Sequence, residues 1–99
     1  MASEDTKPVV LIVDDSEDVH RLLRIRLKHE PIRLQSCLSG MEALAQAKEN
    51  RPAVILLDLD MPELDGFGVL RQLKNDSELT NIPVIVLSGL EQAAYKVTA

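Results

Sequence analysis

Two uninterrupted apolar runs dominate the pattern of hydrophobic and polar positions along the chain. Residues 9–13 and 53–57 are rich in Val, Ile and Leu, and aspartate follows each run. A short apolar run without polar alternation is typical of a strand that is covered on both faces of a parallel sheet. We therefore expect both segments to be central strands.

Two further strands follow from weaker patterns. Residues 32–37 alternate apolar with polar side chains, which is typical of a strand with one wetter face at the edge of a sheet. Residues 82–87 form another apolar run. Pro83 is tolerable there only near the start of the strand, because proline cannot donate a hydrogen bond to a neighbouring strand.

Helical periodicity occupies the intervals between these strands. Residues 16–29 place apolar side chains at helical spacing, with acidic residues first and basic residues later, the order that complements the helix dipole. A second helix is expected from the capping-box pattern of residues 39–42 to about Lys48. Residues 67–74 offer a third apolar helical face, and a fourth helix is expected after the last strand, with Tyr95 on it.

The alternation of strands and helices predicts the fold class. Short links between the elements favour an α/β domain, with a parallel sheet, helices on both of its faces and right-handed crossovers. A chain of 99 residues is long enough for one small domain and too short for two, so residues 1–99 are taken as a single domain. Ligand sites in such sheets lie at the carboxyl ends of the central strands. The residues expected at that edge are Asp14, Asp15, Asp58 and Ser88.

Composition and charge exclude several classes of function. The net charge of −5 argues against direct binding of nucleic acid or anionic lipid by this domain, because both depend on Lys and Arg. No apolar run approaches the roughly 20 residues of a membrane span, and the first residues are acidic where a secretory signal would be basic. Cys37 is the single cysteine, so neither an internal disulfide nor a cysteine-based metal site is expected. We expect a cytoplasmic protein.

The three aspartates suggest a cation site. Asp14, Asp15 and Asp58 would repel one another if all were ionised, so they must share a proton or surround a cation. Oxygen ligands without His or Cys favour a hard ion, and an open site with few carboxylates suits Mg²⁺, for which Mn²⁺ could substitute. An isolated pair of aspartates after a strand is more often a helix cap or solvated surface, but Asp58 after a second buried strand strengthens the metal interpretation.

Three segments together resemble the receiver domain of two-component response regulators, over about residues 8–89. They are Val10-Leu-Ile-Val-Asp14-Asp15, Leu56-Leu-Asp58-Leu-Asp-Met-Pro62-Glu-Leu-Asp65-Gly66 and Val84-Ile-Val-Leu-Ser88-Gly89. The resemblance implies a three-layer α/β/α, flavodoxin-like sheet with strand order 2-1-3-4. Glycine at position 66 suits either a positive φ or a close approach of backbone beside the site.

The resemblance also implies a role for each site residue. Asp58 would accept a phosphoryl group from a phosphohistidine of a sensor histidine kinase, and would also contact the metal. Asp15 would bind Mg²⁺ directly, Asp14 would hold a metal-bound water, and the backbone carbonyl of Asp60 would complete the protein ligands. The hydroxyl of Ser88 would bond to the phosphoryl group and operate a switch toward a partner or an output module, fused or separate.

Two alternatives remain open at this stage. Asp58-Leu-Asp60 after an apolar strand is also similar to the nucleophile motif of haloacid-dehalogenase-like phosphohydrolases, although Pro62 and the upstream Asp14-Asp15 pair do not fit that family. The chain could instead be a structural or interaction module that keeps an acidic pocket and is not phosphorylated.

The sequence departs from the family pattern at its carboxyl end. A complete receiver has a fifth strand, which carries a lysine, and a fifth helix; the sequence ends at Ala99, so both elements are expected to be missing and the domain incomplete. Lys96 follows Ser88 too soon to take the role of that lysine. The fourth strand would then have a bare apolar edge that invites self-association or exchange of segments. His20 and His29 are interpreted as surface residues.

Overall fold

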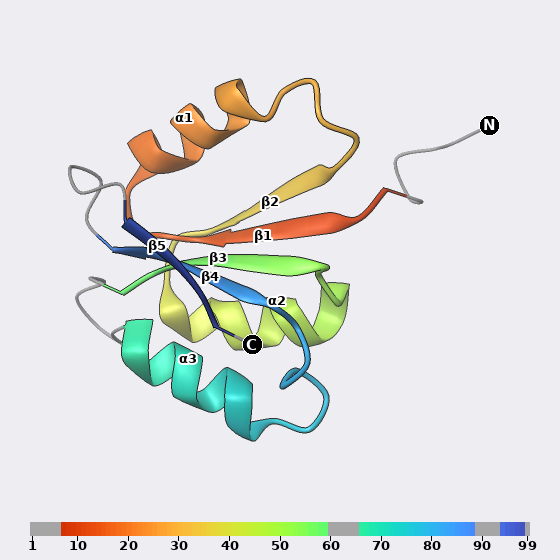
Figure 1. Cartoon of the computed structure of the whole chain (residues 1–99), viewed down its shortest axis with the longest axis vertical. Helices are drawn as coiled ribbons and strands as arrows, with labels where there is room; N and C mark the ends of the chain where they lie inside the picture. Colours follow the sequence, from red (N-terminus) through yellow and green to blue (C-terminus); the bar gives the residue numbers. More distant parts are fainter. Residues whose placement is uncertain (1–6, 60–65, 89–93, 99) are drawn as a thin grey trace.

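The computed structural model describes residues 7–59, 66–88 and 94–98, and strands and helices alternate as predicted from residue 9 to residue 88 (Figure 1). The elements in chain order are β1 (Val9–Val13), α1 (Glu17–Arg26), β2 (Arg33–Cys37), α2 (Gly40–Asn50), β3 (Val54–Asp58), α3 (Gly66–Asn75), β4 (Val84–Ser88) and β5 (Ala94–Thr98). The four strands and three helices expected up to residue 88 therefore form, with bounds that differ from the expected ones by at most three residues. No described helix has the length and apolar character that a membrane crossing requires.

The sheet has the order β2-β1-β3-β4-β5, and its first four strands are parallel. Val10 pairs with Leu34 of β2 on one side and with Val54 of β3 on the other, which makes β1 a central strand. β2 is an edge strand, as its alternating pattern predicted. The predicted order 2-1-3-4 is confirmed.

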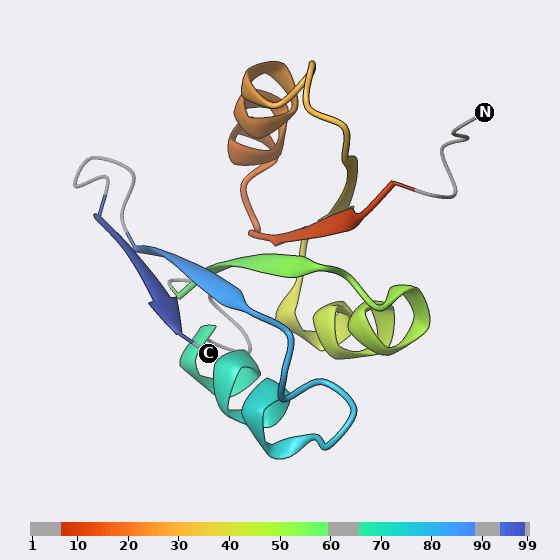
Figure 2. The same cartoon turned by 45° about the vertical axis from the view of Figure 1, so that its right-hand side comes forward.

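The helices cover both faces of the sheet, as the alternation predicted. α1 lies over one face, and α2 and α3 lie over the other (Figures 1 and 2). Successive strand residues point to opposite faces, so β1 and β3 supply side chains to two separate cores. The larger core, which includes residues of α2 and α3, contains Leu11, Val13, Ile55, Leu57, Ala47, Val69 and Leu73. The smaller core contains Val10, Ile12, Leu56 and Leu87, with Leu23 of α1 packed against it.

Serine caps fix the starts of the first two helices. Ser16 Oγ accepts a hydrogen bond from the backbone N–H of Val19 at 3.4 Å, and Ser39 Oγ accepts one from Glu42 at 3.3 Å. Each bond satisfies an amide that the helix itself leaves without a partner. The predicted cap at Ser39 is thus confirmed, and both caps set the directions in which the helices leave the sheet edge.

β5 corrects two expectations drawn from the sequence. Ala94–Thr98 forms a strand that pairs antiparallel with β4, with Lys96 opposite Val86, so the assignment of Tyr95 to a fourth helix is wrong. The expected bare edge of β4 is also wrong, because β5 is hydrogen-bonded along it, which removes the reason given for self-association there. A strand edge gains hydrogen bonds by pairing, and Tyr, Val and Thr are suited to strands. β5 is not the parallel fifth strand that the family pattern implies.

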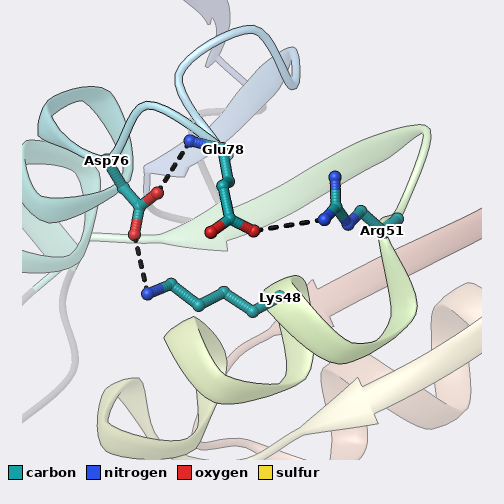
Figure 3. Close-up of polar contacts among 4 residues, drawn as sticks. All are labelled: Lys48, Arg51, Asp76 and Glu78. Atoms are coloured by element: carbon teal, nitrogen blue, oxygen red, sulfur yellow. Dashed lines mark hydrogen bonds and ion pairs between the residues drawn. The ribbon is translucent and has the colours of Figure 1, made fainter.

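An ion-pair network joins α2 to the segment between α3 and β4 (Figure 3). Lys48 Nζ lies 3.0 Å from Asp76 Oδ2, and Arg51 Nη2 lies 3.1 Å from Glu78 Oε1. The backbone N–H of Glu78 donates to Asp76 Oδ1 at 2.8 Å. The hydrogen bond with Lys48 lowers the pKa of Asp76 and raises the pKa of Lys48. Both acids of this network therefore have a cationic partner.

Candidate metal and phosphoryl site

Three carboxylates meet at the carboxyl edge of the sheet. Asp14 and Asp15 follow β1 directly, and Asp58 is the last residue of β3. Because β1 and β3 are parallel neighbours, both strands end at the same edge. One carboxylate oxygen from each residue can be chosen so that all three lie within 4.8 Å of one another. The structure thus brings together the three acids that the sequence singled out.

Asp14 is held in place on several sides. It is 5% exposed, and its backbone N–H donates to the carbonyl of Cys37 at 3.1 Å. Its Oδ1 accepts from the N–H of Ser16 at 2.8 Å, and its carbonyl lies 2.8 Å from His20 Nε2. This carboxylate is therefore oriented before any ligand binds, by contacts with β2, with the cap residue of α1 and with α1 itself.

The electrostatics of the cluster disfavour three negative charges. Burial raises the pKa of Asp14 from 3.8 to about 6, with smaller upward contributions from the charges of Asp58 and Asp15. The hydrogen bond from Ser16 opposes this rise, as does His20 to a smaller extent. A cation at the cluster would offset both the repulsion and the loss of hydration. The donor set is all carboxylate, which fits a hard ion such as Mg²⁺.

Exposure differs among the three acids and suggests a division of roles. Asp15 is exposed and Asp58 is half-buried, whereas Asp14 is buried. Ligands that arrive from solvent can thus reach Asp58 and Asp15, while Asp14 forms the floor of the cluster.

Gly66 lets the chain pack closely beside Asp58. A Cβ at position 66 would collide with the carbonyl oxygen of Asp58 and with Leu59 Cα, and the Gly66 N–H donates to the carbonyl of Leu59 at 3.2 Å. Any larger residue would push the start of α3 away from the end of β3. The close approach expected at this glycine is confirmed.

His20 is not a surface residue, which corrects the sequence interpretation. It is 5% exposed, whereas His29 is exposed as expected. A carbonyl oxygen can only accept, so His20 Nε2 must be the donor in its contact with Asp14. Apolar periodicity could not reveal this role, because the partner is a backbone carbonyl on the loop that precedes α1.

The structure says less about two other expected site residues, Asp60 and Ser88. Asp60 lies outside the described residues, so its carbonyl as a metal ligand stays a prediction. Ser88 ends β4, and the preceding Leu87 pairs with Asp58. The backbone of Ser88 therefore lies one residue beyond the level of Asp58 on the adjacent strand, while the role of its hydroxyl stays a prediction.

A match to a known family accompanies this geometry. The family described as the response regulator receiver domain matches residues 10–99. The chain belongs to this receiver-domain family. The match extends beyond Gly89, where the recognisable motifs end, and supports the receiver interpretation over the phosphohydrolase alternative.

Individual relatives agree with the receiver assignment. The chain is 42% identical over 82 residues to the response regulator PleD of Caulobacter vibrioides, covering 83% of this chain and 18% of PleD. It is 34% identical over 90 residues to the DNA-binding dual master transcriptional regulator RpaA of Synechocystis sp., covering 91% of this chain and 37% of RpaA. The chain thus spans well under half the length of these curated relatives.

Solved receiver structures share the fold. The phosphorylated cyanobacterial phytochrome response regulator RcpA has a TM-score of 0.78 and 35% identity, with 84% of this chain and 66% of that chain covered. The chemotaxis protein CheY4 of Vibrio cholerae has a TM-score of 0.76 and 27% identity, with coverage of 88% and 75%.

Proposed function

We propose that this receiver domain accepts a phosphoryl group on Asp58 from a phosphohistidine of a sensor histidine kinase in the cytoplasm. The observation that carries this proposal is the half-buried carboxylate of Asp58, within reach of Asp14 and Asp15 at the ligand-binding edge of the sheet. An acid at the end of a buried strand has no packing role, and a carboxylate oxygen can act as a nucleophile toward phosphorus.

The transfer would be a nucleophilic displacement at phosphorus, in which the donor imidazole is the leaving group. A carboxylate oxygen of Asp58 attacks phosphorus and forms an O–P bond, while the P–N bond to the donor imidazole breaks and its electron pair stays on nitrogen. The product is an acyl phosphate, which hydrolyses readily and so suits a transient signal. Receiver domains are regulatory proteins, so we expect no turnover of an external substrate.

The chain's own residues would prepare this step. Asp15 would ligate Mg²⁺ directly, Asp14 would orient a water ligand, and Asp58 and the carbonyl of Asp60 would complete the protein ligands. The bound ion would supply positive charge near the phosphoryl oxygens. The contacts that hold Asp14 and the tight packing of Gly66 against Asp58 favour a cluster that is organised before the donor arrives.

The output of the switch follows from a conformational bias. The Ser88 hydroxyl would bond to the phosphoryl group, and the segment after β4 would then shift toward a state that a partner recognises. The relative RpaA is described as a DNA-binding transcriptional regulator. For this chain we propose an output module, fused or separate, and no direct contact of this domain with nucleic acid.

The test is direct phosphorylation. We would incubate the chain with Mg²⁺ and acetyl phosphate, measure the intact mass, and map the modified peptide. The proposed function predicts one added phosphoryl group, located on Asp58 and lost when the metal is chelated. Asp58→Asn should carry none. The matched control Glu78→Gln, in the ion-pair network before the start of β4 and not at the carboxyl ends of the strands, should behave as wild type.

Two results would contradict the proposal. Phosphorylation that persists in Asp58→Asn would move the acceptor elsewhere. A folded chain that binds Mg²⁺ but gains no phosphoryl group would favour the structural or interaction module that the sequence left open.

A further inference from the structure

Two hollows lie between α1 and the edge strand β2, and neither is lined by Asp14, Asp15 or Asp58. α1 and β2 lie side by side in both views (Figures 1 and 2). One hollow of about 400 Å³ is lined by residues that include His20, Arg24, Ser36 and Leu38. A second hollow of about 420 Å³ also includes Arg24. Arg24 lines both hollows, so they are neighbours along α1, and we call the two together the groove.

The second hollow reaches the outer edge of the sheet. Three consecutive β2 residues, Arg33, Leu34 and Gln35, line it. Because these residues are consecutive, the hollow follows the length of β2. β2 ends the strand order of the sheet. A ligand in this hollow would therefore lie beside an edge that can pair with an added strand.

The groove is basic in a chain whose net charge is −5. Arg21, Arg24, Lys28 and Arg33 line it, and Glu17 is the one acid among the lining residues of these hollows. Arg21 is paired with Asp18 at 3.3 Å, so it adds less net positive charge than Arg24 and Lys28. The contact described for Arg24 is to a neutral group, because its Nη2 donates to Ser36 Oγ at 2.7 Å. The positive charge of Arg24 is thus not neutralised by this bond, and a negatively charged ligand would be attracted.

Cations near the end of a helix often do no more than complement its dipole. Arg26 fits that plain role, since it lies in the last turn of α1 and lines neither hollow. Arg24 and Lys28 differ from it because they line the groove together with apolar side chains, namely Leu27, Ile32 and Leu34. A small anion would use the cations alone, whereas a peptide with apolar and acidic side chains would use both.

We propose that the groove between α1 and β2 binds an extended acidic segment of a partner protein, which pairs with the outer edge of β2. Main-chain hydrogen bonds to β2 would supply affinity, as in other cases of strand addition. The acidic side chains would contact Arg24 and Lys28, and the apolar ones would pack on Leu27, Ile32 and Leu34. This binding mode does not depend on phosphorylation of Asp58.

The experiment is an amide NMR titration of the full chain with a short acetylated peptide in which Val and Glu alternate, at low salt. We expect the largest shifts in β2 and in the carboxyl-terminal half of α1. Lys28→Glu should weaken binding by at least about tenfold, because it reverses a charge inside the groove. The matched control Arg26→Glu makes the same charge change on the neighbouring surface and should weaken binding by less than about twofold.

A second peptide separates strand pairing from simple charge attraction. Methylation of alternate backbone nitrogens removes the amide donors and leaves the charges, so the methylated peptide should bind at least about tenfold more weakly. Equal losses in Lys28→Glu and Arg26→Glu would overturn the proposal, as would equal binding of the methylated peptide. Shifts that fall outside α1 and β2, or no binding at low salt, would overturn it as well.

Discussion

Two acidic clusters in this molecule differ in how their charges are balanced. At the carboxyl edge of the sheet, Asp14, Asp15 and Asp58 share a small volume, and the pKa of Asp14 is raised to about 6. In the network between α2 and β4, Asp76 and Glu78 each have a cationic partner, and the pKa of Asp76 is lowered. The same type of side chain is thus disfavoured as an anion in one region and favoured in the other.

The difference indicates what each cluster contributes. The network at Asp76 links two segments of the fold and needs no ligand. The cluster at Asp14 costs stability when it is ionised without a cation, because the carboxylate is buried and its acidic neighbours repel it. The same burial and repulsion favour the binding of a metal ion. Stability and function therefore make opposite demands on carboxylates that lie in one small domain.

The largest effect should come from neutralising the buried acid. Asp14→Asn keeps an oxygen that can accept from Ser16 and removes the cost of the charge. Without metal at neutral pH it should stabilise the fold, by up to about 3 kcal/mol if the whole pKa shift is recovered. Urea unfolding in the presence of a chelator measures this change. A destabilised variant would contradict the account of the cluster, whereas Asp76→Asn should show no such gain.

The free energy of unfolding should depend on pH, because the charge on buried Asp14 destabilises the fold. The carboxyl of Asp14 has a pKa of about 6 in the fold and 3.8 as its ordinary value, so between these values the folded state binds the extra proton. Stability without metal should therefore rise as pH falls from 7 to 5, by about 1 kcal/mol from this group. The measured quantity is the difference between wild type and Asp14→Asn, which should shrink over this range. A difference that grows as pH falls would have the wrong sign.

The smallest effect should come from the ion-pair network. Lys48 and Asp76 form a solvent-accessible pair, and such pairs contribute little and are screened by salt. A double-mutant cycle with Lys48→Ala and Asp76→Ala should give a weak favourable coupling that declines as salt rises. A strong coupling that is independent of salt would show that this network is more than a surface link.

Much of the fold could be predicted from the sequence, because its signals are local. The apolar runs of β1 and β3 are uninterrupted, and the alternation in β2 marks it as an edge. β5 could not be predicted in this way, since Tyr95 and its neighbours become a strand only through pairing with β4. The network of Lys48 with Asp76 depends on how α2 lies against the segment after α3, which no local pattern records.

The site was predictable for a related reason. Asp14, Asp15 and Asp58 each follow or end a buried strand, and parallel strands bring such positions to one edge. The burial of His20 was not predictable, because a lone histidine on a helix gives no sign of its backbone partner. The groove beside β2 could not be predicted either, since it combines residues of α1 with residues of β2, which follows later in the chain.

The most direct test of the central claim is a Mg²⁺ titration followed by thermal unfolding. A ligand that binds only the folded state raises the unfolding temperature, and the rise grows with the logarithm of the ligand concentration relative to its Kd. We predict that Mg²⁺ raises the unfolding temperature of wild type and of Asp76→Asn, and has little effect on Asp15→Asn. An equal rise in Asp15→Asn, or no rise in wild type, would contradict the claim that the three carboxylates form a metal site.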